Sequence, residues 1–357
     1  MRIVFIGDGG SVHNRYMLTW FARRGHEVLF LTDTLDPEMP CETRCVVPRR
    51  GGGPWRHALA AYRVRCILQE WRPDVVHAHN VTGYGYWGAF CGFSPLVMTA
   101  WGSDLNVLAQ DSALVRLLAR SALRRSRLVT ADALALCETA QAIAHQKLDV
   151  RLLQWGVDLA EFDQHIQTSL FPAGWEDLFV FISTRRLREV YNIDIILHAF
   201  AQVVRSIPEA RLLVVGQDVL REDLQKLSRD LTIADRVCFT GWVERRDMVD
   251  LLRQAQVFIS VPSTDSTALS LLEAFAARKP VIVTDLPANR EWIEPGRNGI
   301  LVPPRNEEAL AAAMVSLANN RDGATQWGTY NRTVVEQRGN QDSEMRKLEA
   351  WYYEILT

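Results

Sequence analysis

The sequence predicts an α/β protein built from two doubly wound parallel sheets. Short apolar runs alternate with segments of helical periodicity along the whole chain. The runs are apolar throughout instead of alternating with polar residues, which is typical of parallel strands buried on both faces. The chain has 357 residues and is 48% hydrophobic, which excludes disorder and suits two domains of roughly 100–200 residues each.

Apolar runs in both halves of the chain are expected to form strands. Those of the first half are Ile3–Ile6, Val28–Leu31, Val75–His77, Leu96–Ala100, Leu128–Ala131 and Arg151–Trp155. Those of the second half are Phe179–Ser183, Leu212–Gly216, Val237–Thr240, Val257–Val261, Val281–Asp285 and Ile300–Val302. Stretches between them, such as 113–125 and 269–278, carry apolar residues at helical spacing. Two successive β-α-β series predict two doubly wound domains.

The boundary between the domains is expected where the periodicity lapses, over residues 156–176. We predict a first domain over residues 1–160 and a second over 161–340. A final amphipathic helix within 341–357 is expected to pack back on the first domain. Two facing domains of this kind leave an interdomain cleft at the carboxyl ends of both sheets, where open α/β sheets bind ligands.

Composition excludes several classes of protein. The net charge of −2 gives no reason to expect a nucleic acid partner, although residues 1–160 carry +4 and the remainder −6. The 6 cysteines are scattered and lack the paired spacing of a zinc site. No run of about 20 apolar residues is present to span a membrane, and the chain opens directly on an expected strand without a cleavable signal. These features predict a cytoplasmic protein.

The loop after the first expected strand is Gly7-Asp8-Gly9-Gly10-Ser11. Glycine lets the backbone approach a ligand, and the start of the following helix favours negative charge. Gly9 and Gly10 are therefore candidates for a ligand-facing turn, and a tight turn that needs glycine for its own geometry is the alternative. A dinucleotide fingerprint would need a third glycine where Val12 stands. Asp33 lies near the position of the acid that binds the ribose of NAD, so an NAD-dependent dehydrogenase is a weak alternative.

Two carboxylates stand out in the stretch 257–293. Asp265 and Glu273 lie eight residues apart, a little over two helical turns, so both can face one cleft. The helix between them is expected to begin near Thr267. Its first backbone N–H groups, which suit a diphosphate, belong to Thr267, Ala268 and Leu269. The plainer alternative makes Asp265 an N-cap and Glu273 half of an ion pair.

This stretch resembles glycosyltransferase family 4, a group of retaining enzymes with the GT-B fold. The E-x7-E motif of that family is matched by Asp265 and Glu273, with the first acid shortened, and its tail is matched by LLEAFAARKPVIVTD. Other similar stretches follow the family's order: RGHEVLFLTD (24–33), DVVHAHN (74–80), WGVDLAEF (155–162), LLVVG (212–216) and FTGWV (239–243). The resemblance covers nearly the whole chain and implies two facing Rossmann-like domains.

The resemblance also implies roles for individual residues. Glu273 would hold the ribose of the nucleotide, and Asp265 a hydroxyl of the donor sugar. The helix start at Thr267, Ala268 and Leu269 would bind the diphosphate. Gly216, Trp242 and Val243 would lie near the base. Gly9 and Gly10 would close over the donor from the first domain.

The sequence departs from the family beside the diphosphate. The family places an arginine and, five residues later, a lysine against the departing group, where developing charge is stabilised. Here Arg186 is present, but Tyr191 replaces the lysine. Arg185 or Arg188 could supply the missing charge. Arg186 remains the residue expected to stabilise the leaving group.

A second departure lies in TAWGSD (99–104), where many relatives carry a histidine before the glycine and this sequence has Trp101. Asp104 is retained and is expected to contact the acceptor or the sugar. His77 and His79 end a strand on alternate faces. His79 is the candidate to touch substrate, and a core or loop histidine is the alternative.

No Asp-x-Asp pair occurs in the sequence, although such a pair is the usual metal ligand of the other large glycosyltransferase fold. A site without metal or cofactor is therefore expected, in which a helix dipole and an arginine take the place of Mg²⁺. The arginines at 116, 120 and 124 predict one basic helix face. By default this face is solvated, and the alternative is a peripheral contact with the inner face of an anionic membrane.

The resemblance thus implies a retaining glycosyltransferase with Arg186, Asp265 and Glu273 as catalytic residues. It would move a sugar from a UDP- or GDP-linked donor to a glycan, a lipid-linked acceptor or a small molecule. Two alternatives remain. A degenerate, non-catalytic partner protein is motivated by Asp265, Ala268 and Tyr191, and a sugar-nucleotide epimerase would share the fold.

Overall fold

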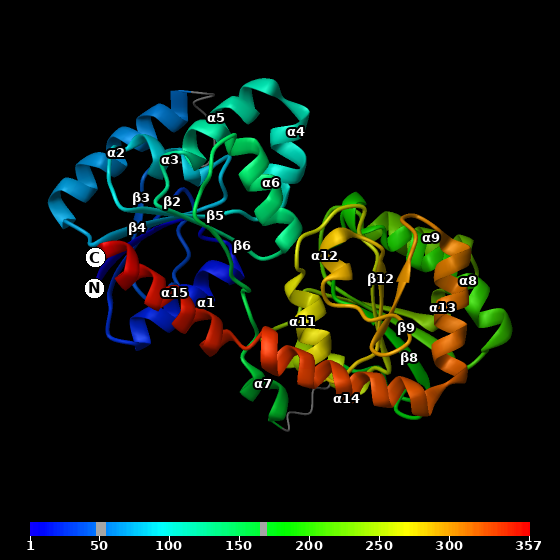
Figure 1. Cartoon of the computed structure of the whole chain (residues 1–357). Helices are drawn as coiled ribbons and strands as arrows, with labels where there is room; N and C mark the ends of the chain where they lie inside the picture. The colour runs from blue at the N-terminus through cyan, green and yellow to red at the C-terminus, as the bar shows by residue number, and fades with distance from the viewer. Residues whose placement is uncertain (48–54, 165–169) are drawn as a thin grey trace. The chain divides into compact units, whose positions relative to one another are not determined.

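The computed structural model describes residues 1–47, 55–164 and 170–357, and the chain divides into two compact units (Figure 1). Unit 1 comprises Met1–Trp155 together with Asp342–Thr357, and unit 2 comprises Gly156–Gln341. The C-terminal segment therefore belongs to the same unit as the N-terminus. The chain leaves unit 1 at Trp155, a few residues before the predicted boundary at 160.

Unit 1 is built on a seven-stranded parallel sheet with the order β3-β2-β1-β4-β5-β6-β7. Its strands are β1 (Arg2–Ile6), β2 (Glu27–Thr32), β3 (Glu42–Cys45), β4 (Val75–His79), β5 (Leu96–Thr99), β6 (Leu128–Ala131) and β7 (Val150–Leu152). The strand order reverses between β1 and β4. Loops that follow these two strands therefore flank the point where doubly wound sheets bind ligands.

Helices cover both faces of this sheet (Figure 1). On one face, α1 (Val12–Arg23) and α15 (Gln341–Leu356) share a buried cluster with the strands, in which Phe21 and Tyr352 take part. The other face carries α2 (Trp55–Trp71), α3 (Tyr84–Phe90), α5 (Ala113–Leu123) and α6 (Leu134–Ala144). A turn of π-helix at Asp104–Leu108 runs into α4 (Ala109–Asp111).

The three arginines of the predicted basic face of α5 differ in their contacts. Arg120 donates through Nε to the carbonyl of Ile143 at 3.1 Å, and Arg124 donates through Nε to the carbonyl of Ala144 at 2.8 Å. Cations there satisfy the last carbonyls of α6 and oppose its dipole. These two arginines therefore fasten α5 to α6, whereas Arg116 lies exposed on the outer surface.

Unit 2 is built on a six-stranded parallel sheet with the order β10-β9-β8-β11-β12-β13. Its strands are β8 (Phe179–Ser183), β9 (Ala210–Val215), β10 (Val237–Gly241), β11 (Val257–Ser260), β12 (Val281–Thr284) and β13 (Gly299–Val302). The order reverses between β8 and β11, so the loops after these strands flank the switch point of this sheet.

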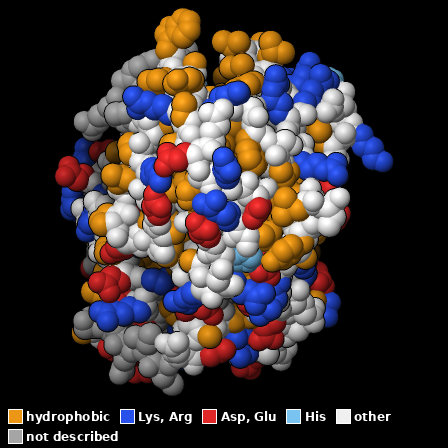
Figure 2. Space-filling model, turned by 90° about the vertical axis from the view of Figure 1, so that its left-hand side faces the viewer, with side chains coloured by type: hydrophobic (Ala, Val, Ile, Leu, Met, Phe, Trp, Pro, Cys, Tyr) orange, Lys and Arg blue, Asp and Glu red, His pale blue; other side chains and the backbone are white. Residues whose placement is uncertain are grey.

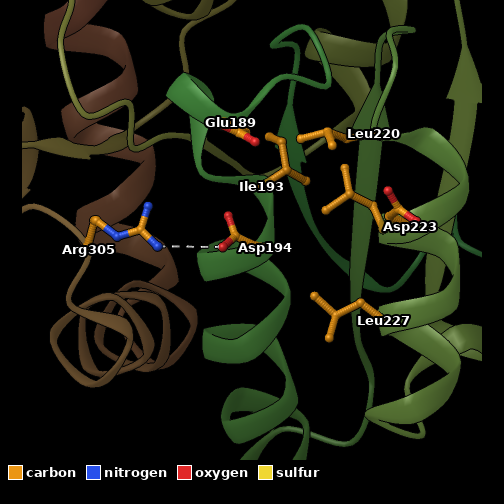
Figure 3. A pocket seen from close by; sticks show the side chains of 8 residues that line it. Glu189, Ile193, Asp194, Leu220, Asp223, Leu227 and Arg305 are labelled. Carbon is orange, nitrogen blue, oxygen red and sulfur yellow. Dashed lines mark ion pairs between the residues drawn. The ribbon is translucent and has the colours of Figure 1, made fainter.

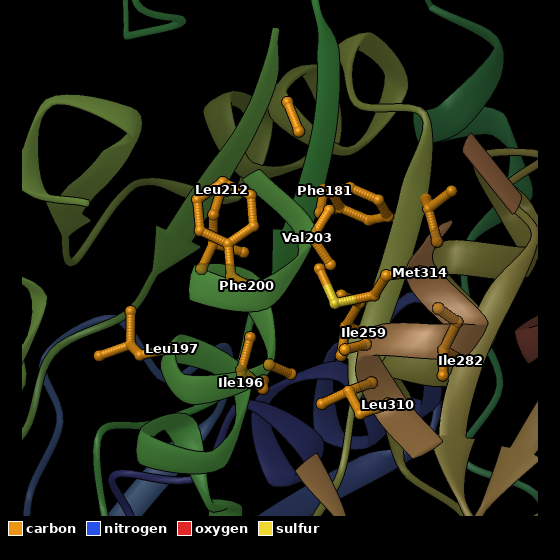
Figure 4. Close-up of a cluster of buried hydrophobic side chains, with 14 of the residues drawn as sticks. Phe181, Ile196, Leu197, Phe200, Val203, Leu212, Ile259, Ile282, Leu310 and Met314 are labelled. Carbon is orange, nitrogen blue, oxygen red and sulfur yellow. The ribbon is translucent and has the colours of Figure 1, made fainter. Parts of the chain in front are cut away.

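Two hydrophobic clusters hold the helices of unit 2 against its sheet. On one face, α8 (Ile193–Ser206), α9 (Arg221–Asp230) and α13 (Glu307–Asn319) pack around Phe181, Phe200 and Met314 (Figure 4). The second cluster contains Phe258, Phe275 and Trp292. The other helices of unit 2 are α7 (Leu159–Asp163), α10 (Arg245–Gln254), α11 (Leu269–Ala276), α12 (Pro287–Arg290) and α14 (Arg321–Arg338). Short 3-10 turns lie at Glu189–Tyr191 and Ala234–Arg236.

The predicted α/β class with two parallel sheets is confirmed, and each predicted apolar run overlaps a strand. The sequence analysis missed β3, whose residues ETRC are polar and partly exposed at the sheet edge. Helix α11 also begins two residues later than expected, at Leu269 with Ala268 as its N-cap. Both differences arise where the sequence carries no strong apolar period.

Candidate functional site

The predicted donor-binding residues lie on loops at one edge of the unit 2 sheet. In a parallel sheet all carboxyl ends of the strands meet at the same edge. Arg185 and Arg186 follow β8, Gly216 follows β9, Trp242 follows β10, and Asp265 lies between β11 and α11. The fold thus brings together residues that are up to eighty positions apart in sequence.

Asp265 is held at the start of α11 by a buried arginine. Nη2 of Arg185 lies 2.7 Å from Oδ2 of Asp265, and Nη1 donates to Oγ of Ser270 at 2.9 Å. The guanidinium also lies over the ring of Tyr191, 4.3 Å from its centroid. A cation held by a carboxylate and an aromatic face adds positive charge beside the helix start, where the dipole already favours anions.

The structure gives the two neighbouring arginines different surroundings. Arg186 is 62% exposed in its side chain and pairs with Asp218 at 2.7 Å. Arg188 pairs with the same carboxylate at 2.6 Å, and this hydrogen bond, with the charges of both arginines, lowers the pKa of Asp218. The family arginine position is thus occupied by an exposed, paired side chain, and the buried cation beside Asp265 is Arg185.

Glu273 is buried in an ion pair, as the plainer alternative for this residue expected, although the sequence did not indicate its partner. Its carboxylate pairs with Nη1 of Arg245, at the start of α10. Nε of the same arginine lies 2.8 Å from Glu161 on α7, and its guanidinium stacks 5.4 Å from the ring of Phe162. A buried carboxylate needs such partners to remain charged. No motif singled out Arg245, because its partners come from two other helices.

The other predicted positions differ in exposure. Thr267 is buried and its hydroxyl accepts from Nε1 of Trp292 at 3.1 Å. Ala268 is buried and Leu269 is partly exposed at the start of α11, which has no side-chain cap. Val243 packs on the second cluster of unit 2, and Trp242 is exposed.

Gly216 is required by its surroundings. Its φ is +151°, and a Cβ there would lie 2.5 Å from the carbonyl oxygen of Arg185. The β9 loop therefore touches the β8 loop that carries the arginines. Three buried hydroxyls at this edge, Ser183 Oγ, Thr184 Oγ1 and Thr284 Oγ1, have no hydrogen-bond partner within the described parts of the chain. Such groups are available to a ligand.

A cavity of about 420 Å³ opens between α8 and α9 (Figure 3). Its apolar lining includes Ile193 and Leu227, and an ion pair of 3.8 Å joins Arg305 to Asp194 at its side. With Glu189 and Asp223 its charged lining is mainly acidic, which disfavours a diphosphate. None of the predicted site residues line this cavity.

The glycine turn in unit 1 is bonded within itself. The N–H of Gly9 donates to the hydroxyl of Thr32 at 2.9 Å, and the N–H of Gly10 donates to Asp8 at 3.0 Å. A Cβ on Gly9 would lie 1.7 Å from the carbonyl oxygen of Thr34. Glycine at position 9 is thus required by close packing of the turn, which was the alternative interpretation.

Asp104 is fully buried and supports its own loop. Its carboxylate accepts from the N–H groups of Val81 at 2.7 Å, Trp101 at 3.1 Å and Leu105 at 3.0 Å. Burial raises its pKa, and these hydrogen bonds oppose the rise. Asp104 therefore shapes this loop, and its contact with the acceptor or the sugar stays a prediction.

His79 is 2% exposed at the carboxyl end of β4. Its Nδ1 bonds to Oδ1 of Asn14 on α1, and burial lowers its pKa to about 3. Its strand neighbour His77 is bonded to Tyr352 of α15 at 2.5 Å and to Thr99 at 2.6 Å. His77 is therefore a core residue, whereas His79 lies at the carboxyl edge of the sheet.

Across the described ranges, no three His, Cys, Asp or Glu side chains are grouped closely enough to hold a metal ion. Among the described residues, no helix is long and apolar enough to cross a membrane.

Comparison with protein families identifies the class. Residues 2–133 match the family described as glycosyl transferase 4-like, and residues 167–334 match glycosyl transferases group 1. Each match lies largely within one unit. The chain belongs to the glycosyltransferase family 4 group, and the resemblance read from its motifs is confirmed.

Two relatives with a described activity match the chain, one over nearly its full length and one over about half of it. The N-acetyl-α-D-glucosaminyl L-malate synthase of Bacillus anthracis is 25% identical over 361 residues, covering 94% of this chain and 91% of the relative. The α-monoglucosyldiacylglycerol synthase of Streptococcus pneumoniae is 28% identical over 176 residues, covering 47% of this chain and 40% of the relative.

Solved structures agree on the fold. Anabaena HepE in complex with UDP-glucose matches with a TM-score of 0.84 and 19% identity, covering 99% of this chain and 100% of that one. At this level of identity the match establishes the GT-B class of fold and nothing finer.

Proposed function

We propose that the protein is a retaining, metal-independent glycosyltransferase that takes its sugar from a nucleotide-diphosphate donor bound by unit 2. The observation that carries this proposal is the group at the start of α11, where Arg185 joins Asp265 to Ser270 and Glu273 follows one turn later. A buried cation, an uncapped helix start and two carboxylates suit a diphosphate flanked by hydroxyl-bearing rings.

Each side chain has a task in this proposal. Glu273 accepts hydrogen bonds from the ribose hydroxyls, and Asp265 accepts one from the donor sugar. Arg186 turns from Asp218 toward the departing diphosphate, while Arg185 keeps Asp265 in place. The bond from the anomeric carbon to the diphosphate oxygen breaks as the bond to the acceptor oxygen forms on the same face. The proton of the acceptor hydroxyl passes to the departing phosphate oxygen, and the arginines stabilise the developing charge.

The relatives support a nucleotide sugar as donor, because HepE was solved with UDP-glucose. UDP and GDP donors are the two candidates. A thermal-shift panel of UDP, GDP, ADP and their sugars tests this directly. A ligand at 100 times its dissociation constant stabilises the folded protein by about 2.7 kcal/mol. A shift with one nucleotide supports the proposal, and no shift with any of them at millimolar concentration contradicts it.

One observation favours the non-catalytic alternative. Both loop arginines are already paired, Arg185 with Asp265 and Arg186 with Asp218. In a protein that no longer binds a nucleotide sugar, both ion pairs would persist because no ligand competes for the arginines. The variant Asp218→Asn frees Arg186. Under the enzyme proposal it retains or raises donor affinity, and under the alternative neither the variant nor the parent binds a nucleotide.

We also propose that unit 1 contacts an anionic lipid surface, which suits a lipid-linked acceptor. Hydrophobic side chains gather along the upper edge of the face in Figure 2, next to Lys and Arg side chains. Trp55 and Tyr62 on α2 are 82% and 65% exposed, and Leu114 and Leu117 on α5 are 66% and 58% exposed. Exposed arginines accompany them at positions 63, 65 and 116. Aromatic and basic side chains together favour anionic membrane interfaces.

Vesicle flotation tests this contact. The protein should float with phosphatidylglycerol vesicles and remain below with phosphatidylcholine vesicles. The double variant Trp55→Ser, Tyr62→Ser should lose flotation, while Tyr353→Ser, an exposed tyrosine on α15, serves as the matched control. Equal recovery of all three proteins with the anionic vesicles would contradict the proposal.

A further inference from the structure

The carboxylate of Glu273 uses only one of its two oxygens within the protein. Residues 270–276 of α11 are all buried, and the side chain of Glu273 is 8% exposed. Its Oε1 pairs with Nη1 of Arg245, whereas Oε2 has no hydrogen-bond partner among the described residues. An ionised carboxylate accepts hydrogen bonds through both oxygens. A buried carboxylate with one oxygen unpaired therefore indicates that a ligand supplies the second donor.

Arg245 is itself held in a fixed direction by α7. Its Nε lies 2.8 Å from Oε2 of Glu161, and its guanidinium lies 5.4 Å from the ring centroid of Phe162, a buried residue. The guanidinium is planar and carries its donors in a rigid fork. Once Nε is bound to Glu161 and the ring packs against the guanidinium, the direction of Nη1 toward Glu273 is determined.

A second arginine fastens α7 to α11. Asp163 of α7 lies 2.8 Å from Nη2 of Arg332, a buried residue of α14. Nη1 of Arg332 donates to the carbonyl of Ala276, the last residue of α11, at 3.1 Å. Helix α7 is thus tied to α11 through two separate arginines. These contacts restrict the movement of Glu161 relative to Glu273.

We propose that Arg245 is a positioning residue for the nucleotide. It holds Oε1 of Glu273 so that Oε2 accepts a hydrogen bond from a ribose hydroxyl, and α7 directs Arg245 through Glu161 and Phe162. A hydrogen bond to an ionised acceptor is stronger than one between neutral groups, so its direction affects affinity. The inference rests on the proposed function, and it assigns to α7 and α10 a part in ribose recognition.

Deoxynucleotides test this role directly, because they lack the hydroxyl that Glu273 is proposed to bind. Calorimetry measures the affinities of UDP, 2′-deoxy-UDP and 3′-deoxy-UDP, or of the guanosine analogues if GDP is the nucleotide that binds. In the parent protein at least one deoxy form should bind about tenfold more weakly. Arg245→Met should bind the full nucleotide about tenfold more weakly and should no longer distinguish it from that deoxy form.

The chain offers a matched control in the next residue. Arg246 also lies at the start of α10, but its side chain is 67% exposed and pairs with Glu244 at 3.2 Å. Arg246→Met should keep the affinity and the discrimination of the parent. Glu161→Gln leaves Arg245 and Glu273 in place but removes the charge that fixes Nε. It should reduce the discrimination by about threefold, less than Arg245→Met does.

The ratio of the two affinities separates positioning from a purely structural role. If Arg245→Met weakens the full and the deoxy nucleotide by the same factor, the ratio is unchanged and the inference is wrong. Affinities equal to those of the parent overturn it as well. Circular dichroism shows whether each variant is folded. Should Arg245→Met unfold, Glu161→Gln decides in its place, and an unchanged ratio in that variant contradicts the inference.

The parent protein separates this inference from the proposed function. If the parent binds no nucleotide, the donor proposal is wrong. If the parent binds a nucleotide but does not distinguish the deoxy forms, the ribose contact of Glu273 is wrong. If the parent distinguishes them and Arg245→Met does so equally well, only the positioning role of Arg245 is wrong, and the donor proposal stands.

Discussion

At the carboxyl edge of the unit 2 sheet, the buried carboxylates Asp265 and Glu273 are each paired with an arginine, whereas the two histidines at the end of β4 in unit 1 are neutral and surrounded by rings. Arg185 and Arg245 each hold a carboxylate in unit 2. His77 and His79 are neutral in unit 1, because burial lowers the pKa of both. Paired charges keep a polar site ready for a charged ligand, and neutral groups suit an uncharged one. Two sheets of the same architecture thus place different chemistry beside their switch points.

The largest expected difference between the units is their response to acid. His79 has a folded pKa of about 3, and that of His77 is also well below its ordinary value, whereas both take up protons near pH 6.5 when unfolded. The unfolded chain therefore binds more protons below pH 6.5. The free energy of unfolding of unit 1 should fall with acidification, by about 1.4 kcal/mol per pH unit for each histidine.

Unit 2 should respond at the other end of the pH scale. Burial lowers the pKa of Lys279 from 10.5 to about 8. Between these values the unfolded chain binds more protons, so the stability of unit 2 should rise with pH there. Hydrogen–deuterium exchange, read separately for peptides of each unit, measures both trends. Acid sensitivity of equal size in the two units would contradict this expectation.

The next largest effect is expected at Glu273. Glu273→Gln removes the buried charge that Arg245 holds and, under the proposed function, an acceptor for the ribose. Donor kcat/KM should fall by about 100-fold, equivalent to about 2.7 kcal/mol. The matched control is Glu244→Gln, an exposed acid beside the start of α10, which should change kcat/KM by less than about twofold. Similar kcat/KM values for the two variants would show that Glu273 does not bind the donor.

A smaller effect on stability is expected where α15 joins unit 1. Tyr352→Phe removes the hydroxyl that bonds to Nδ1 of His77 and leaves a buried nitrogen without that partner. Unit 1 should lose about 1–2 kcal/mol of stability, and unit 2 should be unchanged. Tyr353→Phe alters the exposed neighbour and serves as control. Denaturant unfolding with exchange detection measures the difference. An equal loss in both units would mean that they unfold together.

The smallest expected effect distinguishes the family pattern from the observed packing. Tyr191→Lys restores the family residue but replaces the ring that lies over Arg185 with a second cation. We expect a loss of about 1 kcal/mol in stability and no gain in turnover, while Tyr191→Phe keeps the ring and should be neutral. Thermal unfolding and initial rates measure the two effects. A rise in turnover for the lysine variant would show that the family geometry still applies.

Much of the molecule was determined by the sequence itself. Runs of apolar residues specify buried strands because a parallel sheet hides both faces, and these runs predicted both sheets. The exception, β3, is polar because it lies at an edge. The spacing of Asp265 and Glu273, together with stretches similar to family 4 in both halves, was enough to predict the family that comparison then confirmed.

Only the tertiary structure decided which partners the site residues have. Arg185 and Arg186 are adjacent in sequence, yet one is buried against Asp265 and the other is exposed beside Asp218. Arg245 reaches Glu273, and Asn14 orients His79, across gaps of 28 and 65 residues. Local sequence patterns determine which segments form strands and helices. Contacts between side chains that are distant in sequence depend on the order in which the strands pair in the sheet. For that reason the chemistry of each edge could not be read from motif spacing alone.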